Sequence, residues 1–212
     1  MSPRPSSSTP VAPSEPADTR ARLVHAMARA LQHRGYHGVG LTELLEQAGA
    51  PKGVLYHHFP GGKQALAVAA VEATAAHIHA SLDRLIDEGA DPLPVLAGWL
   101  QMGQQQLERS HFERGCPLAT VALETTADDL PLREALANAF DGIRQRLARL
   151  LVAAGASPGR AEPLAALVVA SYEGALIQAR VARSGAPMTA AATALLTLLQ
   201  HELPARRSAG AP

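Results

Sequence analysis

The chain has 212 residues, of which 47% are hydrophobic but only 3% aromatic, and its formal net charge is zero. That length allows one or two domains, and a single cysteine excludes an internal disulfide framework. No run of about 18 uninterrupted apolar residues predicts a membrane span, and the N-terminus lacks the apolar core of a signal peptide. Alanine and leucine favour helices, so we expect an all-α cytoplasmic protein without a membrane partner.

The charge is unevenly spread along the chain. Residues 18–64 carry six Lys or Arg against three Asp or Glu, whereas residues 65–212 carry 12 Arg against 15 Asp or Glu. A basic N-terminal part on an acidic body indicates one end that binds nucleic acid and one that does not.

The first helix is expected from about Asp18 to Arg34. Gly35 ends it, because glycine adopts the left-handed conformation at no steric cost. Arg20 and Arg22 lie in its first turn, where the helix dipole disfavours cations. A phosphate partner would explain both arginines, and so would solvation at an exposed surface.

Residues 41–63, LTELLEQAGAPKGVLYHHFPGGK, are the most informative stretch. Segment 41–48 has apolar residues at the i, i+3, i+4, i+7 spacing of a buried helical stripe. Gly49 ends that helix, and Pro51 suits the first position of a second helix that ends near His58. A helix, a glycine turn and a helix form the DNA-reading arrangement whose second helix enters the major groove. An ordinary helical hairpin in an all-α protein would have the same spacing.

The outward face of this second helix carries Lys52, Gly53, Tyr56 and His57. Lysine and tyrosine donate hydrogen bonds to phosphate, and glycine lets the backbone come close to the sugar-phosphate chain. The two ring nitrogens of His57 suit a base edge or a neighbouring phosphate. Lys52 and Lys63 are the only lysines in the chain, and both lie in this stretch.

The segment AGAPKGVLYHHFPGGK resembles the recognition-helix signature of TetR-type transcriptional regulators. The similarity covers roughly residues 19–66, and the Gly-Gly before Lys63 together with GCPLATVALE resembles the LmrA-like branch. At the position where the family usually has a capping Ser or Thr, this chain has Gly40, so a phosphate contact there falls to a backbone N–H or to Thr42. The predicted DNA-binding residues are Arg20, Gly40, Thr42, Pro51, Lys52, Gly53, Tyr56, His57 and Lys63.

Six further helices are expected downstream. The first runs from Lys63 to about Glu88 and connects the DNA-reading part to the body. The others are expected over Pro92–Arg109, over Pro117–Thr126, from the acidic turn at Asp128 to about Ala154, over residues 160–183 and over Pro187–His201. His77 and His79 are two residues apart and so point about 200° apart on a helix, and we expect no metal site. Arg144, Arg146 and Arg149 are expected to be mostly exposed.

The helix over residues 160–183 is apolar on most sides, so we expect it to be covered on most sides. Small residues at a 4-3-4 spacing predict a helix–helix seam, and with the last helix it would form a four-helix bundle between two copies of the chain. A buried central helix in a monomer would show the same pattern. The predicted dimer residues are Ala170, Gly174, Ile177, Val181, Leu195 and Leu198.

No phosphate-binding GxxxxGK, no GxSxG and no CxxC is present, so we expect no catalytic site and no cofactor. Cys116 begins a helix, where backbone N–H groups would stabilise a thiolate, and this leaves open a redox sensor or a packed small residue. Aromatic and polar side chains of the body are candidates for a ligand pocket, although each would also suit a plain core. They are Trp99, Met102, Gln106, Phe112, Cys116, Phe140, Tyr172 and Leu176.

These features predict an allosteric DNA-binding homodimer. The family resemblance implies a repressor that leaves double-stranded operator DNA when a small, largely apolar inducer binds. A ligand-independent DNA-binding protein remains open, and a helical enzyme is disfavoured by the missing motifs. The expected division is a disordered tail at 1–17, a helix-turn-helix DNA-binding domain at 18–62, a ligand-binding and dimerisation domain at 63–203 and a disordered tail at 204–212.

Overall fold

The computed structural model describes residues 16–87 and 91–203, and these residues form helices without a strand. The helices are α1 (Pro16–Arg34), α2 (Leu41–Ala48), α3 (Lys52–His58), α4 (Gly62–Asp87), α5 (Pro92–Arg109), α6 (Pro117–Ala122), α7 (Leu130–Ala153), α8 (Pro158–Ala182) and α9 (Ala186–Glu202). The all-α prediction is confirmed. The tails predicted at 1–17 and 204–212 lie outside the described residues, except that α1 already begins at Pro16.

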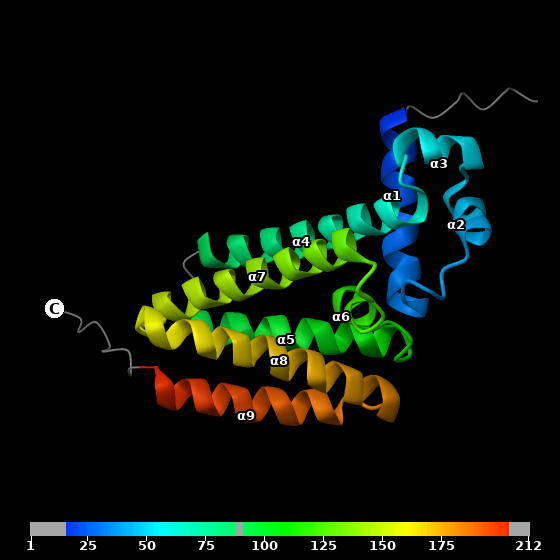
Figure 1. Ribbon diagram of the computed structural model, residues 1–212. Coiled ribbons are helices and arrows are strands. Elements are labelled where there is room, and N and C mark those ends of the chain that lie inside the picture. Colours follow the sequence, from blue (N-terminus) through cyan, green and yellow to red (C-terminus); the bar gives the residue numbers. More distant parts are fainter. Residues whose placement is uncertain (1–15, 88–90, 204–212) are drawn as a thin grey trace, which may run out of the picture.

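The three N-terminal helices gather at one end of the molecule, and α4 runs from them into the body (Figure 1). There α4 packs along α7, α7 packs on α8, and α5 lies beside α8 and α9. The short α6 contacts both α1 and α4, next to the N-terminal helices. Helix α9 forms the outer edge of the body, on the side away from α4 (Figure 1).

The turn between α2 and α3 follows from its glycine. Gly49 has φ 60° and ψ 38°, and its N–H donates to the carbonyls of the last turn of α2. The sequence predicted Pro51 as the first residue of α3. Instead Pro51 is extended, at φ −65° and ψ 151°, and is the N-cap that precedes the helix. Leu55 and Phe59 are buried in the core cluster that also contains residues of α1 and α2.

The helix after Cys116 is shorter than predicted and ends at Ala122 instead of Thr126. The Thr125 hydroxyl donates to the carbonyl of Ala122, and the Asp129 carboxylate accepts hydrogen bonds from the backbone and hydroxyl of Thr126. These side-chain bonds compete with the helical backbone pattern and close a turn before α7.

By length and composition alone, α4 and α8 are apolar enough to cross a membrane. Both pack against neighbouring helices within the body. Two such helices are weak evidence for a membrane protein.

Candidate functional site

Helix α3 presents an exposed polar face. Lys52 and His57 are exposed, and the Tyr56 side chain is 47% exposed, whereas Leu55 on the opposite face is fully buried. No atom lies within 4 Å of the position that a Cβ at Gly53 would occupy. The structure therefore leaves all four residues free to meet an elongated partner.

The remaining predicted DNA-binding residues differ in their exposure and in the side chains that they contact. Gly40, Thr42 and Pro51 are exposed, and Gly40 caps α2 without a side-chain hydrogen bond. The Arg20 guanidinium lies 5.2 Å from the centre of the Phe59 ring. The Lys63 Nζ lies 4.8 Å from the centre of the Tyr36 ring, and its partial burial lowers its pKa while Glu124 acts in the opposite direction. Lys63 is thus partly buried, whereas Lys52 is exposed.

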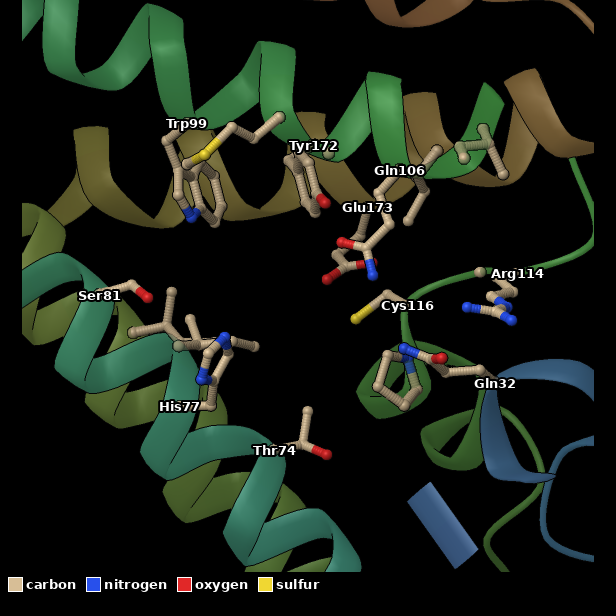
Figure 2. A pocket seen from close by; sticks show the side chains of 18 of the residues that line it. Gln32, Thr74, His77, Ser81, Trp99, Gln106, Arg114, Cys116, Tyr172 and Glu173 are labelled. Atoms are coloured by element: carbon tan, nitrogen blue, oxygen red, sulfur yellow. The ribbon is translucent and has the colours of Figure 1, made fainter. Parts of the chain in front are cut away.

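A cavity of about 300 Å³ lies in the body between α4, α5, α8 and the start of α6 (Figure 2). Its wall contains six residues that the sequence nominated: Trp99, Met102, Gln106, Cys116, Tyr172 and Leu176. The rings of Trp99 and Tyr172 lie with their centres 4.7 Å apart and their planes tilted by 36°. The Tyr172 ring presses against the backbone of α5 at Gly103, where a Cβ would come within 2.4 Å of its hydroxyl.

Phe112 and Phe140 do not line this cavity, contrary to the prediction. Phe112 follows α5 in a left-handed conformation, at φ 64°, and packs against a small cluster that includes Leu176 and Met188. Phe140 packs on the main core from α7. Both side chains belong to the packing between helices, which residue type alone does not distinguish from a pocket wall.

Sequence reasoning missed most of the polar wall of the cavity, which consists of Gln32, Thr74, His77, Ser81, Arg114 and Glu173. Gln32 comes from α1, so the N-terminal helices contribute directly to a cavity in the body. Glu173 had one usable signal, because it is the only charged residue between Leu164 and Ala179.

Burial raises the pKa of Glu173 to about 7, and a hydrogen bond from Cys116 opposes the shift only in part. Burial and the nearby Glu173 also raise the pKa of the Cys116 thiol far above its ordinary value, although backbone N–H groups of α6 act against this. Since the thiolate is the reactive form, a raised pKa of Cys116 disfavours the redox role that the sequence left open.

Several contacts join the cavity wall and its surroundings to the N-terminal helices, including one between the His37 ring and the Glu124 carbonyl at 3.3 Å. The Arg114 Nε donates to the His33 ring at 3.2 Å. The Glu124 carboxylate, just past α6, accepts the backbone N–H of His37 at 2.9 Å. Gly35 lies against the same carboxylate with φ 66°, and a Cβ there would come within 1.7 Å of Glu124 Oε1.

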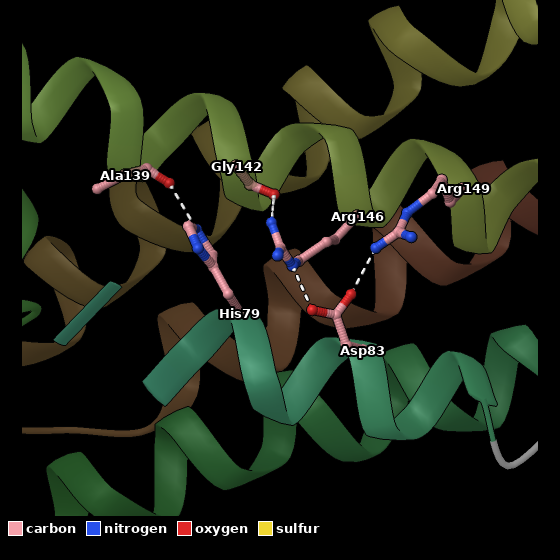
Figure 3. A network of polar contacts seen from close by, with 6 residues as sticks. All are labelled: His79, Asp83, Ala139, Gly142, Arg146 and Arg149. Carbon is pink, nitrogen blue, oxygen red and sulfur yellow. Dashed lines mark hydrogen bonds and ion pairs between the residues drawn. The ribbon is translucent and has the colours of Figure 1, made fainter. Parts of the chain in front are cut away.

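Helix α4, which contributes one wall of the cavity, packs against α7 and is joined to it by polar contacts (Figure 3). The Asp83 carboxylate of α4 accepts hydrogen bonds from Arg146 and Arg149 of α7. Burial alone would raise the pKa of Asp83, but these two arginines hold it below its ordinary value. Arg146 was predicted to be mostly exposed, yet its side chain is only 23% exposed because it bridges Asp83 and the Gly142 carbonyl.

The outer faces of α8 and α9 are apolar and exposed. Ile177 is 46% exposed, Val181 81% and Leu198 38%, and Ala170 is also exposed. Leu195, which was predicted on the same surface, is instead only 5% exposed and lies in the core of its own chain. Leu195 and Leu198 are three positions apart, about 60° around the helix, so Leu195 lies on the covered side of α9 and Leu198 at its exposed edge.

Comparison with known proteins places these features in one family. Residues 23–70 match the bacterial regulatory proteins of the tetR family, and residues 92–194 match the C-terminal domain of the LmrA/YxaF-like transcriptional regulators. An HTH-type transcriptional regulator of Mycobacterium tuberculosis is 34% identical over 88% of this chain and 97% of its own length. The chain belongs to the TetR family of transcriptional regulators.

Other TetR-family relatives agree. LmrA of Bacillus subtilis is 31% identical over 87% of this chain and 98% of its own length, and the repressor NemR of Escherichia coli is 31% identical over 81% and 88%. The crystal structure of a TetR regulatory protein from Rhodobacter sphaeroides has a TM-score of 0.75 at 27% identity, over 84% of this chain and 97% of that one. These proteins are DNA-binding regulators and not enzymes, which confirms the predicted class and the resemblance to the LmrA-like branch.

Proposed function

We propose that this TetR-family protein is a homodimeric repressor that leaves its operator DNA when a small, largely apolar molecule occupies the cavity. The observation that carries the proposal is the shared wall of the cavity. Gln32 of α1 lines it beside Arg114, and Arg114 is hydrogen bonded to His33 of the same helix. A ligand that moves this wall therefore acts on a helix of the DNA-binding part.

The mechanism follows from the geometry of a dimer on DNA. Two recognition helices must reach successive major grooves, which lie about 34–36 Å apart on one face of the duplex. A ligand that displaces α1 or α4 changes the spacing that the two α3 helices present. The affinity for DNA then falls by as much as the ligand prefers the other arrangement.

The dimer would form through the outer faces of α8 and α9. Apart from Glu173, which points into the cavity, no charged residue lies between Leu164 and Ala179, and α9 has none from Ala186 to Gln200. Exposed apolar surface of this kind is typical of an interaction site. The proposal also keeps the boundary between a DNA-binding domain that ends at residue 62 and a ligand-binding and dimerisation domain that begins at residue 63. It keeps the cytoplasmic location as well.

The test uses the DNA upstream of the protein's own gene. Fluorescence anisotropy of that DNA would be titrated with protein, with and without aromatic compounds small enough for the cavity. Trp99, the only tryptophan, reports occupancy of the cavity by its own fluorescence. We expect compounds that change Trp99 fluorescence to weaken DNA binding over the same concentration range. If occupied protein binds DNA unchanged, the chain is the ligand-independent DNA-binding protein that the sequence left open.

A further inference from the structure

The cavity contains a carboxyl group that lacks a charged partner, since its one side-chain hydrogen bond comes from the Cys116 thiol. The Glu173 Oε2 atom is inaccessible to solvent and accepts no hydrogen bond, and Glu173 forms no salt bridge within residues 16–87 and 91–203. Figure 2 shows this carboxyl at the centre of the wall, between Gln106 and Cys116. A buried carboxylate without a cation is costly, because a single thiol hydrogen bond does not replace the hydration that the carboxylate has lost.

The groups around the carboxyl do not supply the missing charge. From its own helix comes Tyr172, from α5 comes Gln106, and from the start of α6 comes Cys116, all of them neutral or held neutral by burial. His77 faces the cavity from α4. Arg114 lines the cavity on the far side of Cys116 and gives its Nε hydrogen to His33 (Figure 2).

Arg180 of α8 lies next to Gly115 in the loop between α5 and α6. Neither this guanidinium nor that of Arg114 forms a salt bridge with Glu173 in the described part of the chain.

The rest of the wall suits a positive charge on an apolar body. Trp99 and Tyr172 place two aromatic rings in the same cavity, with Tyr172 between Trp99 and Glu173 (Figure 2), and Met102 also lines the cavity. Aromatic faces attract organic cations, most strongly where water is excluded. We propose that the ligand of this cavity is a monovalent organic cation with an aromatic or branched apolar body, whose charge pairs with Glu173. The inference rests on the proposed function of the cavity and names the chemical class of its ligand.

This pairing makes ligand binding depend on pH. Burial raises the pKa of Glu173 to about 7 in the empty cavity, and a cation binds the ionised carboxylate. Below pH 7 the carboxyl must release its proton as the cation enters, so the affinity should fall about tenfold for each pH unit. A neutral ligand of the same shape makes no such demand.

The experiment compares two probes of equal shape on the full-length protein. Phenyltrimethylammonium carries a permanent charge, and tert-butylbenzene is its neutral isostere, so only the charge differs. Binding is followed by Trp99 fluorescence between pH 5.5 and 8, in the wild type and in Glu173→Gln, which keeps the shape of the side chain. At pH 8 we expect the wild type to prefer the cation at least about tenfold through charge attraction, and the variant to lose most of that preference.

Each outcome bears on the inference. In the wild type the affinity for the cation should rise with pH, and this rise should disappear in Glu173→Gln. Equal binding of the two probes, binding of neither, or an unchanged preference in Glu173→Gln overturns the cationic class. The pH profile of the wild type tests the pairing even if the variant folds poorly.

DNA release is measured separately by anisotropy on the same samples. If the neutral probe binds and releases DNA as well as the cation does, the proposed repressor function stands and this inference fails. If the cation binds through Glu173 but DNA binding is unaffected, this inference stands and ligand-controlled repression fails.

Discussion

At the scale of single residues, Glu173 lowers the stability of the empty protein at neutral pH. Its pKa is raised from 4.5 to about 7, so the folded state holds a proton that the unfolded state has released between these values. The free energy of unfolding should therefore fall as the pH rises from 4.5 to 7, and the full penalty is present above 7. A shift of this size corresponds to on the order of 3 kcal/mol.

Glu173→Gln removes this ionisation. We expect the variant to be more stable than the wild type at pH 8 and to lose that advantage near pH 4.5. Urea unfolding at the two pH values measures the difference. A variant that is destabilised equally at both would mean that the carboxyl is satisfied in the folded protein.

A substitution at Gly53 tests DNA binding separately from folding. A methyl group at this position meets no atom of the protein within 4 Å, and alanine is the better helix former by about 0.5–1 kcal/mol. Gly53→Ala should therefore raise the melting temperature slightly. If the backbone of α3 approaches DNA closely, the same methyl group should weaken DNA binding several-fold. Equal or tighter DNA binding by Gly53→Ala would show that α3 does not come close to the duplex at this residue.

At the scale of helices, the outer face of α8 allows a clean test of the dimer. A side chain at Gly174 meets nothing within 4 Å in the single chain, so Gly174→Leu should leave the monomer folded and obstruct a partner. Gly159 at the start of the same helix is equally open, and Gly159→Leu is the matched control. Sedimentation velocity at micromolar concentration should give a monomer for Gly174→Leu and a dimer for the control. Two intact dimers would move the interface elsewhere.

The helices could be predicted to within a few residues, because glycine and proline mark most of their ends. The predicted start at Pro92 and end at Arg109 are those of α5, and Gly49 ends α2 through its left-handed conformation. Two kinds of information could not be predicted. Thr125 and Asp129 shortened α6 through side-chain hydrogen bonds, which periodicity does not contain.

The second kind is which segments and helix faces pack together in the folded chain, and the cavity is an example. Six of its lining residues could be nominated because large or polar side chains in apolar helices are conspicuous. Gln32 could not be predicted, because the nearest other wall residue, Thr74, lies about 40 residues further along the chain. The packing of α1 against α4 and α6 brings Gln32 to the cavity. Leu195 illustrates the same limit, since leucines on neighbouring faces of α9 are alike in composition and differ only in what covers them.

At the scale of the whole molecule, Glu124 is the clearest mechanical link between the two ends. Its carboxylate accepts the His37 N–H in the loop between α1 and α2. We expect Glu124→Ala to leave both the ligand affinity and the DNA affinity of the empty protein within about twofold, since the contact touches neither partner. The factor by which a ligand weakens DNA binding, usually about 5- to 150-fold in allosteric proteins, should fall.

Glu124→Gln keeps an acceptor oxygen of the same reach and is the matched control. It should retain most of the coupling in an anisotropy titration with the ligand present and absent. Full coupling in Glu124→Ala would mean that the signal travels through α4 or through Arg114 alone.

The shared wall of the cavity has a consequence for hybrid regulators. Exchanging DNA-reading parts between relatives, to redirect a sensor to a new promoter, invites a cut between α3 and α4. Such a cut removes Gln32 together with this chain's own DNA-reading part, and the foreign part places another side chain in the binding site. The hybrid would then respond to altered inducer concentrations although no residue of the retained body had changed. Keeping glutamine at position 32 and histidine at position 33 in the grafted head should restore the original dose response.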